Sequence, residues 1–241
     1  NKRIKDGLPV YNLGLGENII KQPNVLIENL KKFSDKKHYT TVNGIPYLEN
    51  ELKKNYSSKN FKVDKVIVGN GLKELLFIIQ LCFDGKIFHI NPSWVSYYEQ
   101  IKILNKEDDL VRVNTDFNNK FKIDLLDLEN KFKKYKDDKK IIIFNNPCNP
   151  TGLLRSENEI KDLAELLKKY NCIVLADEIY QEINHFNIFK SVSEFIPELT
   201  IKASSISKDM GCGGYRLGWL LFPKELEYFY DKCAAYSSSI Y

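Results

Sequence analysis

Polar and charged side chains stand where short apolar runs of the chain end. Asp177 follows the run Cys172–Ala176, and Lys208 follows Thr200–Ser204. Because Asp177 follows a buried-type apolar run, we expect it to be partly buried, and a buried carboxylate without a cationic partner lowers stability. A lysine beside serines and glycines can form a covalent bond with a carbonyl group, and Arg216 can bind an anion next to it. Structural interpretations stand beside these, with Asp177 as an N-cap and Lys208 as an exposed loop residue.

Three further run ends carry groups that could contact a ligand. Gly69-Asn70-Gly71 leads directly into a predicted helix, where backbone N–H groups can bind a phosphate, although the turn fits neither the P-loop nor the dinucleotide fingerprint. Trp94 could stack on a flat ligand or belong to the core. Asn149 lies between Pro147 and Pro150, which stiffen its loop. Five successive run ends therefore offer complementary chemistry.

These side chains need a scaffold that gathers strand ends. Runs such as Ile141–Phe144 are continuously apolar, which is typical of strands covered on both faces. We predict strands at Lys65–Val68, Lys86–Ile90, Leu110–Val113, Lys140–Phe144, Cys172–Ala176, Thr200–Ser204 and Gly218–Phe222. We predict helices between them at Leu72–Phe83, Val95–Asn105, Leu125–Lys136, Ser156–Tyr170 and Lys224–Tyr236. The alternation predicts an α/β fold, with a mostly parallel seven-stranded sheet sandwiched by helices.

The first part of the chain has a different pattern. Residues 1–60 contain turn residues at Gly14–Gly16 and Asn43–Pro46 and one amphipathic helix near Val25–Lys32. We expect them to form an N-terminal arm and connecting segment, and residues 61–241 to form the main domain. The ligand site belongs to this main domain, because ligands of open α/β sheets bind outside the carboxyl ends of the strands.

The composition excludes several protein classes. The 241 residues are 43% apolar and carry a net charge of +4, which suits a globular protein and is too small for one that binds mainly nucleic acid or an anionic membrane. No apolar run approaches the ~20 residues of a membrane span. The five cysteines lack a C-x-x-C pair, so we expect a reducing, cytoplasmic location and no metal site. Since Met210 is the only methionine, we expect a longer translation product.

The ordered motifs resemble a known family. Asn149–Gly152, Asp177–Tyr180 and Ser205–Lys208 with Arg216 eight residues later resemble the class I/II aminotransferases, which are pyridoxal-phosphate enzymes of fold type I. The resemblance extends over nearly the whole chain. It also includes the following segments: Gly16-Glu17, Tyr39 with Asn43–Pro46, Gly71–Glu74 and Trp94–Tyr97.

The resemblance implies roles for the polar residues. Asp177 pairs with the pyridine nitrogen of pyridoxal phosphate, the electron sink of these enzymes. Lys208 holds the cofactor covalently and, once displaced by a substrate amine, moves a proton at the substrate Cα. Asn149 and Tyr180 hydrogen-bond the ring 3-oxygen, and Trp94 stacks on the ring. Lys208, Asp177 and Tyr180 are thus the catalytic residues that we expect.

The resemblance also implies binding residues and a partner. A tyrosine matching Tyr39 reaches the phosphate of the other subunit, so we expect a homodimer. Gly16, Trp94 and Asn149 are expected to contact the amino-acid or 2-oxo-acid substrate. We expect the phosphate to be bound by backbone N–H groups and side chains of Gly71, Leu72, Lys73, Ser205, Ser207 and Arg216.

The chain departs from the family pattern in three ways. Family members continue into a C-terminal small domain, which carries the arginine that binds the substrate carboxylate, and this chain stops at Tyr241. Leu72 replaces the hydroxyl or small residue of many relatives. The stretch from Gly211 to Tyr215 is richer in glycine than usual.

The interpretation that we favour is an aminotransferase that exchanges an amino group between an L-amino acid and a 2-oxo acid by a ping-pong mechanism. A pyridoxal-phosphate lyase on the same scaffold uses the same motifs. A non-catalytic or truncated cofactor-binding module is the alternative from another class, which the missing arginine favours and the complete set of ring-binding residues disfavours. A dinucleotide-binding protein is the weakest alternative, because the glycine fingerprint is lacking.

Overall fold

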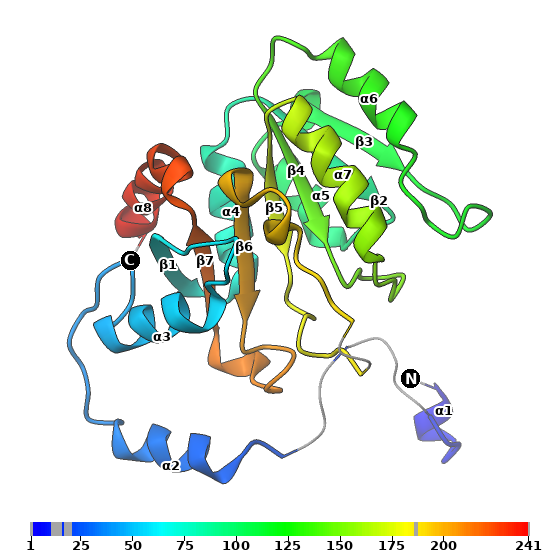
Figure 1. Cartoon of the computed structure of the whole chain (residues 1–241). Helices are drawn as coiled ribbons and strands as arrows, with labels where there is room; N and C mark the ends of the chain where they lie inside the picture. The colour runs from blue at the N-terminus through cyan, green and yellow to red at the C-terminus, as the bar shows by residue number, and fades with distance from the viewer. Residues whose placement is uncertain (1, 11–15, 17–20, 186–187, 241) are drawn as a thin grey trace.

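The predicted strands form one sheet in the computed structural model, which describes residues 2–10, 16, 21–185 and 188–240. The strand order is β1-β7-β6-β5-β4-β2-β3 (Figure 1). All neighbours pair in parallel except β7, which runs antiparallel to both β1 and β6. The strands are β1 (Lys65–Asn70), β2 (Lys86–Asn91), β3 (Leu110–Asn114), β4 (Lys140–Asn145), β5 (Cys172–Asp177), β6 (Thr200–Ser205) and β7 (Leu217–Phe222). The predicted seven-stranded, mostly parallel sheet is confirmed.

Helices cover both faces of this sheet. One face packs against α4 (Leu72–Cys82), α5 (Val95–Ile103) and α8 (Glu227–Ile240). The other packs against α6 (Leu125–Lys134) and α7 (Glu157–Lys169), with α3 (Pro46–Tyr56) over β1 and β7. Strand β5 shows why its run is continuously apolar: Leu175 packs in the first layer and Val174 in the second. The predicted sandwich is therefore confirmed.

The predicted strands end one or two residues too early at the edge where their carboxyl ends meet. Asn70, Asn145, Asp177 and Ser205 still belong to β1, β4, β5 and β6. The prediction stopped where polar residues interrupt the apolar pattern. The backbone pairing of β4 with β5 nevertheless continues as far as Asn145 and Asp177. The side chains at these positions are consequently held by sheet backbone rather than by loops.

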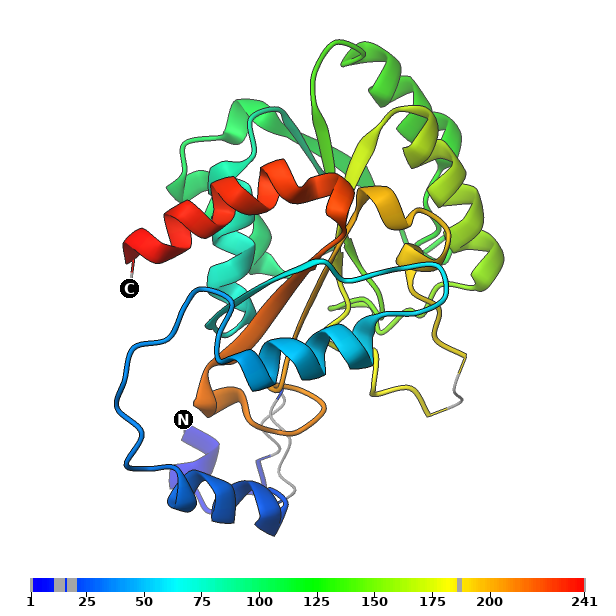
Figure 2. The ribbon, with the colours of Figure 1, turned by 60° about the vertical axis from the view of Figure 1, so that its left-hand side comes forward.

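The first sixty residues contain more helix than predicted. Helix α3 was not predicted, because Pro46 was interpreted as part of a turn, whereas it occupies the first turn of the helix, where proline needs no N–H partner. Leu52 of α3 is buried in the core. The helix expected near Val25–Lys32 is α2 (Asn24–Lys32); it has no buried residue and lies apart from the sheet (Figures 1 and 2).

Short helical turns complete the structure. Helix α1 spans Lys2–Lys5, and α8 begins after the turn η5, so the helix predicted from Lys224 starts as a 3-10 turn. Gly14 and Glu17, named in the sequence analysis, lie outside the described residues. Within the described ranges, no helix has the length and apolar character needed to cross a membrane. The 3-10 turns are η1 (Glu107–Asp109), η2 (Val192–Glu194), η3 (Pro197–Leu199), η4 (Gly213–Tyr215) and η5 (Lys224–Leu226).

Candidate active site

A cavity of about 590 Å³ gathers most of the predicted site residues at the carboxyl ends of the strands. Gly71 and Ser205 are not part of its wall, although both neighbour residues that are. Tyr39 is fully exposed and lies outside the cavity. The predicted residues that line it are Gly16, Leu72, Lys73, Trp94, Asn149, Asp177, Tyr180, Ser207, Lys208 and Arg216.

Asp177 is the one acidic residue among the described residues that line this cavity. It ends β5 and is only 3% exposed, and its Oδ2 accepts a hydrogen bond from the Tyr97 hydroxyl at 2.5 Å. Its Oδ1 accepts from the N–H of Ile179 at 3.2 Å, which stabilises a turn rather than capping a helix. Within the described part of the chain it forms no ion pair. Burial raises the pKa of Asp177 to about 6, and the Tyr97 hydrogen bond opposes this rise.

This raised pKa predicts how the stability of the cofactor-free protein depends on pH. Because the pKa of Asp177 is higher in the folded state, its contribution is fully present below about pH 4 and is lost as pH rises through 6. A change from 3.8 to about 6 corresponds to roughly 3 kcal/mol. The measurement is the free energy of unfolding by urea at pH values from 3.5 to 7.5. Over this range we expect it to fall by roughly 3 kcal/mol more in the wild type than in Asp177→Asn.

Tyr97→Phe provides the matched variant for this measurement. It removes the hydrogen bond that lowers the pKa of Asp177, so the loss of stability should extend to higher pH than in the wild type. Identical pH profiles for the wild type and Asp177→Asn would show that Asp177 does not titrate in this range.

A chain of amides connects Asp177 with Asn149 and Tyr180. Asn145 donates from Nδ2 to the backbone oxygen of Asp177 at 3.0 Å, and its Oδ1 accepts from the N–H of Asn149 at 2.7 Å. Asn149 in turn donates from Nδ2 to the Tyr180 hydroxyl at 3.3 Å. Burial raises the pKa of Tyr180. Asn145 therefore orients the loop that carries Asn149, a role that sequence analysis did not assign.

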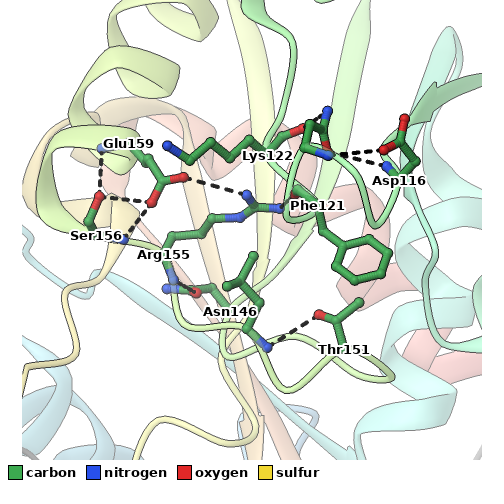
Figure 3. Close-up of polar contacts among 10 residues, drawn as sticks. Asp116, Phe121, Lys122, Asn146, Thr151, Arg155, Ser156 and Glu159 are labelled. Carbon is green, nitrogen blue, oxygen red and sulfur yellow. Dashed lines mark hydrogen bonds and ion pairs between the residues drawn. The ribbon is translucent and has the colours of Figure 1, made fainter.

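Arg155 anchors the far end of this loop (Figure 3). Its backbone N–H donates to Oδ1 of Asn146 at 3.0 Å, and its buried guanidinium donates to the backbone oxygen of Phe121 at 2.5 Å. Glu159 lies 3.8 Å from the same guanidinium and also forms a capping box with Ser156 at the start of α7. The loop between β4 and α7 is thus fixed at both ends, which restricts the position of Asn149.

The opposite wall has the features of an anion site. Gly71 has a φ of +76° and precedes α4, whose N-terminus has no side-chain cap. Arg216 donates to the backbone oxygens of Asn70 at 3.0 Å and Gly213 at 2.7 Å. A Cβ at Gly71 would lie 2.3 Å from Nη2 of Arg216. The guanidinium therefore lies beside the N-terminus of α4, where negative charge is favoured.

Lys208 reaches the cavity from the loop after β6. Its Nζ donates to the backbone oxygen of Gly16 at 3.0 Å, so Gly16 lies at the cavity. Ser205 is buried, and its hydroxyl accepts from the N–H of Ser207 at 3.1 Å, which shapes the turn before Lys208. The ammonium of Lys73 lies 5.0 Å from the centre of the Trp94 ring. Amine, carboxylate and anion site thus share one cavity.

Several lining residues were not predicted as site residues. Tyr97 and Asn145 carried a signal, because Tyr97 belongs to the motif segment Trp94–Tyr97 and Asn145 directly follows the predicted strand Lys140–Phe144. Gln22 carried none: its segment meets the glycine-rich loop only through long-range folding, with Nε2 donating to the backbone oxygen of Gly211 at 3.3 Å. The unpredicted lining residues are Gln22, Tyr97, Asn145, Ile179, Gly211, Gly213 and Gly214.

Several proteins with a named activity are similar to this chain in sequence. A probable aspartate aminotransferase of Methanocaldococcus jannaschii is 35% identical over 226 residues, which cover 89% of this chain and 57% of that protein. An aspartate aminotransferase of a Bacillus species is 30% identical over 88% of this chain and 56% of its own length. The chain therefore spans a little over half the length of these curated relatives.

A solved structure agrees in fold. The aspartate aminotransferase of Thermotoga maritima superposes with a TM-score of 0.86 and 26% identity, over 99% of this chain and 64% of that one. Residues 9–238 match the family described as aminotransferase class I and II. This match takes in the walls of the cavity from Gly16 to Arg216. The chain belongs to the class I and II aminotransferase family.

Proposed function

We propose that the cavity binds pyridoxal phosphate and that this chain is the cofactor-binding part of an aminotransferase. Members of the family are pyridoxal-phosphate enzymes. The observation that carries the proposal is that Lys208 and the buried carboxylate of Asp177 line one cavity together with an anion site. A cofactor with an aldehyde, a basic ring nitrogen and a phosphate matches these three groups.

The phosphate end of the cavity fits this cofactor. Arg216 offers a planar donor group suited to two phosphate oxygens, and the first turn of α4 offers N–H groups without a side-chain cap. The backbone at Gly71 approaches so closely that a Cβ would fill the space taken by the guanidinium. We assign the phosphate to Arg216 and to the N–H groups of Leu72 and Lys73, with Ser205 and Ser207 shaping the adjoining turn.

The ring end also fits. Asp177 lacks an ion-pair partner among the described residues, and a protonated ring nitrogen would supply one. Trp94 forms a flat wall on which an aromatic ring can stack. Asn149 and Tyr180 lie within hydrogen-bonding distance of each other and can both bind a ring oxygen.

The chemistry divides between cofactor and protein. Pyridoxal phosphate, when bound, supplies an electron-accepting ring for electrons released at the substrate Cα. Asp177 would keep the ring nitrogen protonated, because a buried carboxylate stabilises a neighbouring positive charge strongly. Lys208 would hold the cofactor at rest and, once released from it, would move a proton at the substrate Cα through Nζ. Tyr180 and Asn149 would fix the orientation of the ring while Lys208 holds the cofactor and while it moves the proton.

Substrate and assembly follow as further parts of the proposal. The curated relatives are named aspartate aminotransferases, so we propose aspartate as amino donor and a 2-oxo acid as acceptor. We propose a homodimer in which the exposed Tyr39 reaches the partner's phosphate site, with Gly16 close to the substrate. A cytoplasmic location fits the five free cysteines.

Visible absorption spectroscopy tests the proposal. Wild-type protein with pyridoxal phosphate should show a visible band that Lys208→Ala lacks. Aspartate should bleach this band and release its 2-oxo acid, and a second 2-oxo acid should restore the band. Lys202→Ala is unsuitable as a control, because Lys202 forms a buried ion pair with Glu178, so exposed Lys161→Ala serves instead.

Each outcome has a distinct meaning. If folded wild type shows no band that depends on Lys208, the cofactor assignment is wrong. If the band forms and aspartate releases ammonia without a new amino acid appearing from an added 2-oxo acid, the protein is a lyase. A band that no amino acid bleaches would indicate a binding module.

A further inference from the structure

Helix α5 contacts three separate parts of the cavity through one face. Trp94 directly precedes the helix, Tyr97 donates to Asp177, and Gln100 donates from Nε2 to the backbone oxygen of Lys73 at 2.7 Å. Residues spaced by three lie on the same side of a helix. The helix therefore links the aromatic wall, the end of β5 and the first turn of α4.

Gln80 of α4 fixes the orientation of the Gln100 amide. Its Nε2 donates to Oε1 of Gln100 at 2.7 Å, and both side chains are buried. Gln100 thus accepts from α4 through its oxygen and donates to α4 through its nitrogen. An amide with one partner on each end has only one orientation that satisfies both.

The side chains of Gln80 and Gln100 are buried between two helices whose other buried residues are mostly apolar. The neighbouring buried residues of the two helices include Leu76, Ile79 and Ile101. Within the described residues, Oε1 of Gln80 is buried and has no hydrogen-bond partner. An unpaired buried acceptor lowers stability, whereas replacing both members of a pair by apolar groups avoids this cost. Stability alone therefore does not explain the pair.

We propose that Gln80 and Gln100 are positioning residues that hold the first turn of α4 at a fixed distance from Trp94 and Asp177. This inference rests on the proposed function. The phosphate and the ring of pyridoxal phosphate are joined by a short link, so both ends bind at full strength only if the two walls keep the matching separation. Loosening the pair affects the phosphate end, because Trp94 stays at the start of α5 and Asp177 stays at the end of β5.

The experiment compares two ligands that differ only in the phosphate. Dissociation constants of pyridoxal phosphate and pyridoxal are measured for wild type, Gln100→Leu and the double variant Gln80→Leu/Gln100→Leu. For both variants we expect the constant for pyridoxal phosphate to rise about tenfold, or about 1.4 kcal/mol, and that for pyridoxal to change less than about twofold. The double variant should resist urea at least as well as wild type.

Thr200→Val is the matched control for a lost buried hydrogen bond. In the wild type, the Thr200 hydroxyl donates to the backbone oxygen of Ile196 at 2.6 Å. Ile196 lies in the core layer on the other face of the sheet from α4 and α5. Thr200→Val should lower the stability and leave the ratio of the two dissociation constants at the wild-type value.

The outcomes separate this inference from the proposed function. If wild type forms no Lys208-dependent band, the proposed function fails. If wild type binds both ligands and the ratio stays unchanged in Gln100→Leu and in the double variant, the positioning role is wrong and the function stands. Equal weakening of both ligands, in step with lost stability, would also overturn the positioning role.

Discussion

Asp177→Asn is expected to slow the amino-acid half-reaction by a factor of about 10² to 4 × 10³. Asparagine keeps the shape of the side chain and removes the charge that would hold the ring nitrogen protonated. Breaking a buried charge pair costs about 3–5 kcal/mol, and each ~1.4 kcal/mol is a factor of ten in rate. The measurement is the rate at which aspartate bleaches the visible band in a stopped-flow spectrometer, with saturating cofactor.

Asp124→Asn is the matched control for this charge removal. Asp124 caps α6 by accepting from the N–H groups of Leu126 and Asp127, and asparagine caps a helix about as well. Its bleaching rate should equal that of wild type. A bleaching rate in Asp177→Asn within threefold of wild type would refute the role of Asp177 at the ring nitrogen.

Gly71→Ala is expected to weaken binding of pyridoxal phosphate by at least about 100-fold. The backbone there has φ +76° and ψ 165°, a conformation essentially restricted to glycine, and the added Cβ would displace Arg216. Hydrogen bonds to charged groups contribute about 1.5–3 kcal/mol each, so losing two of them accounts for this factor. Equilibrium titration followed by absorption measures it.

Gly85→Ala is the matched control, because it introduces a similar clash at a glycine that lies away from the cavity. Gly85 has φ +150°, and a Cβ would lie 2.4 Å from the backbone oxygen of Lys139, beside the amino end of β2. Both variants should lose stability, about 1–3 kcal/mol from clash and strain. Only Gly71→Ala should lose cofactor affinity, and equal affinities in the two variants would contradict the phosphate assignment.

Much of the fold was predictable because the signals are local. The run before Asp177 is apolar on both faces, as required for a central parallel strand, and Ser156 with Glu159 marks the start of α7. Since parallel strands share one carboxyl edge, placing the strands also placed Asp177 and Lys208 at a common cavity. The position of each motif after a strand was therefore enough to predict which residues form the site.

The remaining features depend on contacts between distant segments. No local pattern shows that Gln100 donates to the backbone of Lys73, or that Gln22 meets Gly211. Helix α3 was missed for a different reason, because a proline at a first helical turn has the same local sequence as a loop. Orientation and long-range pairing therefore required the three-dimensional structure.

The antiparallel placement of β7 has a consequence for how the chain acquires its site during synthesis. Of the seven strands in this sheet, β7 is synthesised after the other six, yet it lies between β1, the first of them, and β6. The hydrogen bond from Arg216 to Asn70 joins residues 146 positions apart. Contacts of such sequence separation form late and slow folding. A nascent chain that has not yet released β7 from the ribosome cannot bring Arg216 to Asn70, so we expect the proposed cofactor to bind only after the sheet is complete.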